Sequence, residues 1–159
     1  MSELAIINTT EGEMVIEFWP DVAPGHVENF KKLAQKGFYD DTAFHRVIKG
    51  FMIQTGQVAD GRACGVPNLR DEIDPARSFA TVGALAMANA GRPNTGSCQI
   101  FITVAPQKPL DGDYTLFGQV VSGQDVADQI SEVPVKNERP VTQVIIKSVT
   151  IERRSRVAR

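Results

Sequence analysis

The chain has 159 residues, of which 42% are hydrophobic and 23% are charged, and its formal net charge is −2. This length suits a single domain that buries a sizeable core without metals or disulfides, and the composition excludes a disordered or fibrous protein. The slightly negative charge offers no field that would attract a phosphate backbone, so we expect no nucleic-acid partner.

No apolar run approaches the length that a bilayer requires, and the first residues lack a basic stretch followed by a long apolar one. We therefore expect no membrane association and a cytoplasmic location. In a reducing cytosol the two cysteines, Cys64 and Cys98, are expected to be free thiols. Four metal ligands at zinc-finger spacing are absent, and we expect neither a metal nor another cofactor.

Eight short stretches have the composition of β-strands and are bounded by Gly, Asn, Asp or Pro. The first two are joined through residues 10–12, as in a hairpin. The predicted strands cover residues 4–8, 13–18, 43–48, 51–56, 84–88, 99–104, 115–121 and 143–152. Eight strands with few helices indicate a closed barrel or a sandwich.

Two segments have helical periodicity instead. The first runs from Pro24 to Gly37, which can end a helix in the left-handed conformation. The second has Ser122 as its N-cap and Pro134 as its stop. Two such amphipathic helices fit the two open ends of a barrel. Residues 57–77 have little periodicity and form a long loop, which is either functional or held by its own packing.

The chain has only two histidines, so a histidine-based hydrolytic triad has little material. His26 is expected on the surface, at the start of the first helix. His45 is expected to be a hydrogen-bonded structural residue, because alternation turns it to the opposite strand face from Arg46. Nucleophile elbows, phosphate-binding loops and dinucleotide fingerprints are also absent, which favours a reaction catalysed by shape, hydrogen bonds and a cation.

Residues 44–54 are too apolar for an ordinary surface loop, yet they carry Arg46 and Gln54. Alternation places Met52 and Gln54 on one face, and Gly50 supplies the turn that brings Arg46 beside them on the neighbouring strand. We interpret this segment as one wall of a binding site. In a second strand, Gln99 and Phe101 share one face, while the small residues Ala88 and Ala90 leave room for a ligand backbone.

Four separated motifs resemble those of cyclophilins, a family of peptidyl-prolyl cis-trans isomerases. They are residues 44–54, residues 87–91, residues 99–102, and Leu110-Asp111-Gly112 followed by Phe117-Gly118. They occur in order and span nearly the whole chain. The resemblance implies a mainly β fold, a closed eight-stranded antiparallel barrel capped by two α-helices, over residues 1–152, with 153–159 as a basic tail. It also suggests a short, single-domain, prokaryotic-like form.

By the same resemblance, Arg46 is the catalytic residue. The implied substrate-binding residues are Phe51, Met52, Gln54, Ala88, Asn89, Ala90, Gln99, Phe101, Leu110 and Tyr114. The implied partners are Xaa-Pro peptides and unfolded or folded proteins, whose folding the enzyme would assist as a monomer, without a metal or other cofactor. Arg46 would donate a hydrogen bond to the prolyl nitrogen as the amide bond twists, in a non-covalent mechanism.

Three positions depart from the family pattern. Pro109 replaces a frequent tryptophan, so cyclosporin binding is expected to be weak. Tyr114 replaces a frequent histidine, and Cys98 stands where a serine is common. Two alternatives remain open: a binding module that keeps the groove without catalysis, and a redox-regulated enzyme in which Cys64 and Cys98 pair and close the pocket.

Overall fold

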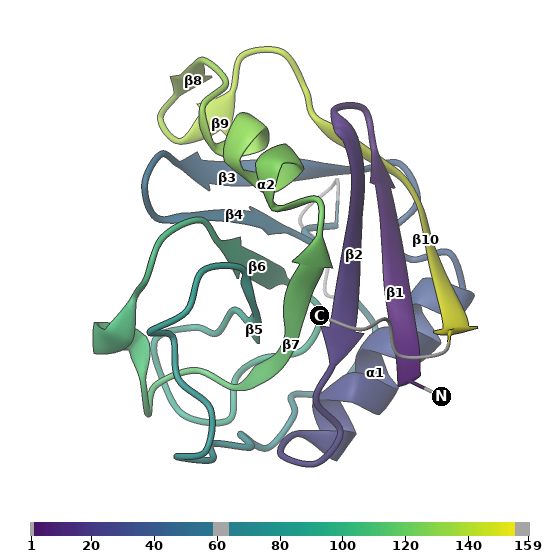
Figure 1. Ribbon diagram of the computed structural model, residues 1–159, viewed down its shortest axis with the longest axis vertical. Helices are drawn as coiled ribbons and strands as arrows, with labels where there is room; N and C mark the ends of the chain where they lie inside the picture. Colours follow the sequence, from purple (N-terminus) through teal and green to yellow (C-terminus); the bar gives the residue numbers. More distant parts are fainter. Residues whose placement is uncertain (1, 59–63, 155–159) are drawn as a thin grey trace.

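A closed barrel of eight strands forms the centre of the molecule (Figure 1). The computed structural model describes residues 2–58 and 64–154. Around the barrel the strands follow the order β1-β10-β3-β4-β6-β5-β7-β2, and every neighbouring pair is antiparallel. Closure excludes the sandwich and confirms the predicted barrel.

All eight predicted strands are present, with ends that differ by a few residues from those predicted. They are β1 (Ser2–Thr9), β2 (Gly12–Phe18), β3 (Thr42–Ile48), β4 (Met52–Thr55), β5 (Ala84–Met87), β6 (Ile100–Thr103), β7 (Leu116–Ser122) and β10 (Ile145–Arg154). The chain also forms a small hairpin, β8 (Val135–Lys136) with β9 (Arg139–Pro140), and a 3-10 helix, η1 (Lys108–Leu110). Because β10 continues to Arg154, only residues 155–159 of the expected tail lie outside the described residues.

Two helices, α1 (Pro24–Gln35) and α2 (Gln124–Ser131), lie at opposite ends of the barrel (Figure 1). Gly37 follows α1 with a φ of 77°, as predicted. The prediction that Ser122 caps α2 is wrong, since Ser122 ends β7 and Gly123 is the N-cap. Gly123 has a φ of 87°, and a Cβ there would lie 2.3 Å from the carbonyl oxygen of Glu13, so only glycine fits this crossing.

Alternation divides the buried side chains between two clusters. Along β6, Ile100 and Ile102 face the main core inside the barrel, and Phe101 belongs to a second cluster on the wall with Met52 and Phe79. This is the division expected for a strand with a packed inner face and a working outer face. The second cluster therefore forms the floor of any site on this part of the wall.

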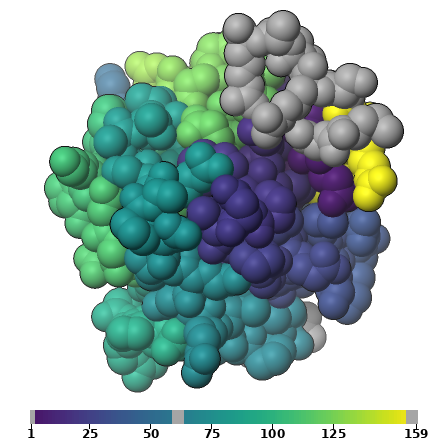
Figure 2. Space-filling view, turned by 60° about the horizontal axis from the view of Figure 1, so that its bottom comes forward, coloured from purple at the N-terminus to yellow at the C-terminus, as the bar shows by residue number. Residues whose placement is uncertain are grey.

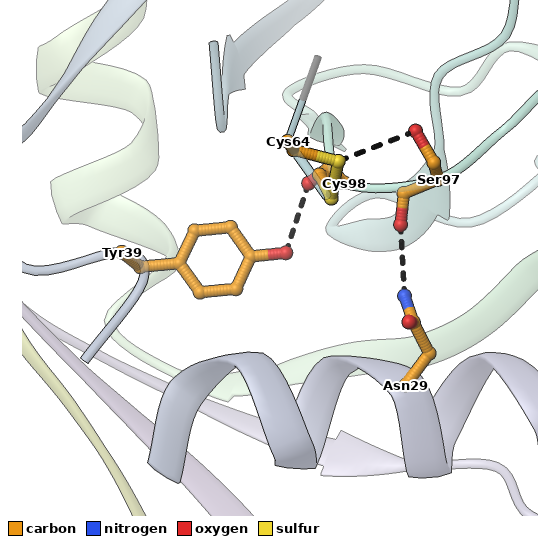
Figure 3. Close-up of a disulfide and its surroundings, with 5 residues drawn as sticks. All are labelled: Asn29, Tyr39, Cys64, Ser97 and Cys98. Carbon is orange, nitrogen blue, oxygen red and sulfur yellow. Dashed lines mark hydrogen bonds between the residues drawn. A yellow bond between two sulfur atoms is a disulfide. The ribbon is translucent and has the colours of Figure 1, made fainter. Parts of the chain in front are cut away.

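The two cysteines form a disulfide, so the prediction of free thiols is wrong (Figure 3). The Cα atoms of Cys64 and Cys98 are 6.5 Å apart although 34 positions separate them in the sequence. Around the disulfide, the Tyr39 hydroxyl donates to the Cys98 carbonyl at 2.9 Å, and Asn29 donates to the Ser97 carbonyl at 2.8 Å. The prediction of free thiols rested on the expected reducing cytosol. That expectation carries no information on the tertiary contact between the long loop and the residue two positions before β6.

His26 is buried, with 1% of its surface exposed, which contradicts the expected surface position. Its Nδ1 lies 2.6 Å from Oε1 of Glu72, and this carboxylate also accepts from the backbone N–H groups of Gly25 (3.1 Å) and His26 (2.8 Å). Glu72 thus caps the N-terminus of α1 from the long loop. Burial raises the pKa of Glu72, but these hydrogen bonds outweigh it and hold the pKa below its ordinary value.

The same loop is fixed to the end of β2. The Arg77 guanidinium lies 4.3 Å from the ring centroid of Trp19 and donates to Asp21 at 3.1 Å. Figure 2 shows these segments, purple and teal, side by side on one face. The described part of the loop is therefore held by packing, one of the two roles expected for it.

Replacing Glu72 with glutamine is expected to lower the free energy of unfolding at pH 7 by about 1–2 kcal/mol, because the N-terminus of α1 loses its charged cap. Since the pKa of Glu72 is lower in the folded chain than in the unfolded one, its contribution is present at neutral pH and disappears as the pH falls below 4.5. Urea unfolding of both proteins at pH 7 and at acidic pH measures the difference in their free energies of unfolding. A stability difference that stays constant with pH would contradict it.

Candidate active site

A small pocket on the barrel wall contains nine of the eleven residues predicted for the site. Its volume is about 70 Å³, which suits a single ring rather than a drug-sized molecule. The residues that line it are Arg46, Phe51, Met52, Gln54, Ala88, Asn89, Phe101, Leu110 and Tyr114. Gln99 lies just behind this lining, bonded to Gln54 at 2.8 Å. Ala90 is exposed beside it, and its N–H donates to Thr95.

The hairpin of β3 and β4 presents Arg46 to this pocket by means of a β-bulge. Phe44 pairs with Thr55 and Arg46 pairs with Gln54, so His45 is an extra residue on β3. In a regular strand, positions 44 and 46 would face the same side. The bulge lets Phe44 enter the main core while Arg46 turns outward with 45% of its side chain exposed. Alternation alone was therefore the wrong basis for orienting His45 and Arg46.

Three hydrogen bonds hold the polar side of the pocket. Arg46 Nη1 donates to Gln54 Oε1 at 3.3 Å, and Gln54 Nε2 donates to Gln99 Oε1 at 2.8 Å. On its other edge, Arg46 Nε donates to Glu138 Oε1 at 3.1 Å. Sequence reasoning did not find Glu138, which is 92 positions away from Arg46.

His45 lies behind this row of polar side chains. Burial and then the charge of Arg139 lower its pKa, a hydrogen bond with Gln99 opposes them, and Arg46 adds a smaller lowering effect. Because the pKa lies below 6.5, the imidazole is mostly neutral at pH 7. The contact with Gln99 agrees with the structural role predicted for His45, but the buried Nδ1 of the ring has no hydrogen-bond partner among the described residues.

The apolar floor is a layer of packed aromatic rings. Phe101 stacks on Phe79 with a centroid distance of 6.0 Å and 7° between the ring planes. Tyr114 stands edge-on to Phe101 at 5.4 Å and to Phe79 at 6.4 Å. Phe79 is completely buried and was not among the predicted residues, since it follows the irregular loop and belongs to no strand pattern. It fixes the two rings that line the pocket.

Asp111 anchors the segment that carries Leu110 and Tyr114. Its carboxylate accepts from the Ser78 hydroxyl at 2.6 Å and from the Phe79 N–H at 2.7 Å. Hydrogen bonds from Ser78 and Phe79 lower the pKa of Asp111. The Leu-Asp-Gly motif therefore ties η1 to the chain that supports the floor.

Asn89 uses its side chain to hold the rim of the pocket. Its Nδ2 donates to the Asp113 carbonyl at 3.1 Å, and its Oδ1 accepts from the Gly91 N–H at 2.9 Å. The carboxamide is thus engaged within the protein, so the contact with a peptide expected of Asn89 falls to its backbone.

A larger cavity of about 360 Å³ lies on the other side of Tyr114. The carboxylates in its lining include those of Glu72 and Asp111, which are bound to α1 and to residues 78–79.

Within the described residues, no three His, Cys, Asp or Glu side chains gather as a metal site would require. Over residues 2–58 and 64–154, no helix is long and apolar enough to cross a membrane.

The sequence matches a family model, "Cyclophilin type peptidyl-prolyl cis-trans isomerase/CLD", over residues 4–151. The chain belongs to the cyclophilin family. Among curated cyclophilins, the peptidyl-prolyl cis-trans isomerase-like 1 of Neurospora crassa is 42% identical over 152 residues, which are 92% of this chain and 93% of that protein. The protein of the same name from Homo sapiens is 40% identical over 148 residues, 89% of each chain.

A solved cyclophilin from Cryptosporidium parvum has the same fold, with a TM-score of 0.90 and 31% identity over 98% of this chain and 100% of that one. A second structure of that protein, solved in the presence of the dipeptide Ala-Pro, has a TM-score of 0.85 and 30% identity over 95% and 99% of the two chains. This cyclophilin is thus a peptidyl-prolyl cis-trans isomerase by family. The relatives named here are eukaryotic and give no support to a prokaryotic-like form.

Proposed function

We propose that this cyclophilin assists protein folding by accelerating rotation about Xaa-Pro bonds, through a non-covalent mechanism in which Arg46 is the catalytic donor. One observation carries the proposal: a guanidinium anchored on two edges stands beside an apolar pocket for a single ring. No covalent intermediate is required, because the reaction only rotates a bond.

The pocket would hold the pyrrolidine ring. Met52 and Phe101 are 1% and 5% exposed, and Phe79 and Tyr114 pack against Phe101. A ring placed on this floor loses contact with water, while the flexible Met52 adapts to its shape. The proline side of the bond is then fixed.

Arg46 would act on the bond itself. Amide resonance imposes a barrier of about 18–20 kcal/mol to rotation. As the bond twists, the prolyl nitrogen becomes pyramidal and gains a lone pair that can accept a hydrogen bond from Arg46. This interaction is weak in the planar amide and strong in the twisted one, so it lowers the barrier rather than merely strengthening binding.

Gln54, Gln99 and the backbone of Asn89 would hold the peptide on the other side of the proline. Gln54 is only 9% exposed, and its side chain is fixed between Arg46 and Gln99. Anchoring the chain while the carbonyl swings keeps the reacting bond in place during rotation.

The Cryptosporidium parvum relative solved with Ala-Pro supports Xaa-Pro segments as the ligands of this chain. We propose unfolded and folded proteins carrying such segments as substrates, with the enzyme acting as a cytoplasmic monomer. The alternative is a binding module that grips proline without catalysis.

Exchange NMR on an Xaa-Pro peptide distinguishes the two functions. A catalytic amount of the enzyme is expected to produce cis-trans exchange cross-peaks that the free peptide lacks, since uncatalysed exchange takes tens to hundreds of seconds. Shifted peaks without faster exchange would establish the binding module and refute the isomerase.

Cyclosporin is expected to inhibit this enzyme weakly, because Pro109 in η1 is exposed and cannot supply the indole N–H of the frequent tryptophan. Replacing Pro109 with tryptophan should lower the inhibition constant by about tenfold, the effect of one added hydrogen bond with some buried ring area. Inhibition of the isomerase rate measures both. Tight inhibition of the unmodified enzyme would contradict this expectation.

A further inference from the structure

The hairpin of β8 and β9 carries an uncommon turn residue beside Arg46. Its two central residues, Asn137 and Glu138, have φ angles of 53° and 68°. Two-residue hairpins with both φ values positive favour glycine at the second position, because a Cβ there crowds the backbone. Glutamate at this position costs roughly 1 kcal/mol relative to glycine. The chain thus keeps a carboxylate where the backbone favours no side chain.

Glu138 joins this turn to β3 at Arg46. Its backbone carbonyl accepts from the Val47 N–H at 2.6 Å, and its Oε1 accepts from Arg46 Nε at 3.1 Å. Figure 1 shows the small hairpin beside β3. One residue therefore both docks the hairpin and bonds the neighbouring guanidinium.

The ion pair between Arg46 and Glu138 adds little to the stability of the fold. The side chains of Arg46 and Glu138 are 45% and 52% exposed, and ion pairs this open to water contribute little to folding. An exposed pair that costs backbone strain and adds little stability points to a role in the site.

The hydrogen-bond pattern shows what that role is. A guanidinium has five N–H donors in one plane. The Nε–H donates to Glu138 and one Nη1–H donates to Gln54, so the plane is fixed from both edges. Among the described residues, none accepts from the other N–H groups, which can therefore meet a peptide. With Gln54 alone, the group could swing about its single anchor.

We propose that Glu138 is a positioning residue for catalysis, which holds the Arg46 guanidinium in the plane that meets the twisted prolyl nitrogen. This inference rests on the proposed role of Arg46. It predicts that a change at Glu138 affects turnover without weakening either the fold or peptide binding.

The test is Glu138→Gly, which removes the carboxylate and relieves the left-handed backbone. The melting temperature is expected to stay the same or rise, while kcat falls about tenfold and KM stays within about twofold, as for a misplaced catalytic group. Glu138→Gln keeps an acceptor oxygen without the charge, so its kcat should fall less than that of Glu138→Gly. The matched control is Glu132→Gln, which removes an exposed carboxylate 3.9 Å from Lys49 and should leave kcat unchanged.

Combining Glu138→Gly with Arg46→Ala separates the two proposals. If Glu138 acts through Arg46, it has no further effect on kcat once Arg46 is absent. An unchanged kcat in Glu138→Gly, together with a slow Arg46→Ala enzyme, would overturn the positioning role and leave the proposed function intact. A fast Arg46→Ala enzyme would overturn the proposed function itself.

Discussion

Replacing Arg46 with alanine is expected to lower kcat by about two to three orders of magnitude, the usual effect of removing one donor aimed at a transition state. KM is expected to change only a few-fold, because the aromatic floor and Gln54 remain in place to bind the peptide. A protease-coupled assay with a proline tetrapeptide gives the rate, and NMR titration gives the affinity. An unchanged rate would refute the catalytic role of Arg46.

Arg46→Lys separates charge from geometry. Lysine keeps the positive charge but lacks the planar fork that bonds Glu138 and Gln54 at the same time. We therefore expect its rate to lie between those of the alanine variant and the unmodified enzyme. Arg154→Ala, on the exposed end of β10, is a control for the loss of a positive charge and should have full activity.

Breaking the disulfide should have the largest effect on stability. The 34-position separation of Cys64 and Cys98 closes a long loop in the unfolded chain, and a loop of this size corresponds to about 3–4 kcal/mol. Cys64→Ala is the suitable change, because Cys64 is only half-buried and alanine adds no polar group. Urea unfolding should show this loss, with a melting temperature lower by about 10 °C.

Dithiothreitol provides the matched control for the disulfide. It should lower the stability of the unmodified protein to that of Cys64→Ala and leave the variant itself unaffected. Well below the melting temperature, both redox forms should isomerise proline at equal rates, because the pocket is open with the disulfide formed. Equal rates would exclude the alternative in which pairing of Cys64 and Cys98 closes the pocket and regulates the enzyme. Equal stability of both redox forms would refute the structural role of the disulfide.

The strands and most of the site could be predicted because their signals are local. Period-two alternation in residues 99–104 gives the inner and outer faces of β6, and the cyclophilin motifs bring Arg46, Met52 and Phe101 to one wall. These features depend on residues that are neighbours in sequence or belong to a family pattern.

The features that sequence reasoning missed depend on distant contacts. His26 is buried because Glu72 reaches it from a loop 46 positions away. Glu138 reaches Arg46 across 92 positions, and Phe79 enters the floor from irregular chain. A periodic pattern in the sequence contains no information on such long-range contacts, so they are found only in the folded structure.

The bulge in β3 gives His45 an importance that does not depend on its side chain. Its backbone forms the bulge, so that Phe44 and Arg46 face opposite sides of β3 although they are two positions apart. Deleting this single residue would make Phe44 and Arg46 successive residues of a regular strand and keep them on opposite faces, whereas a regular strand that retains position 45 would turn Arg46 toward the core. The outward position of Arg46 thus depends on the register of β3 against β4, and not on which side chain stands at position 45.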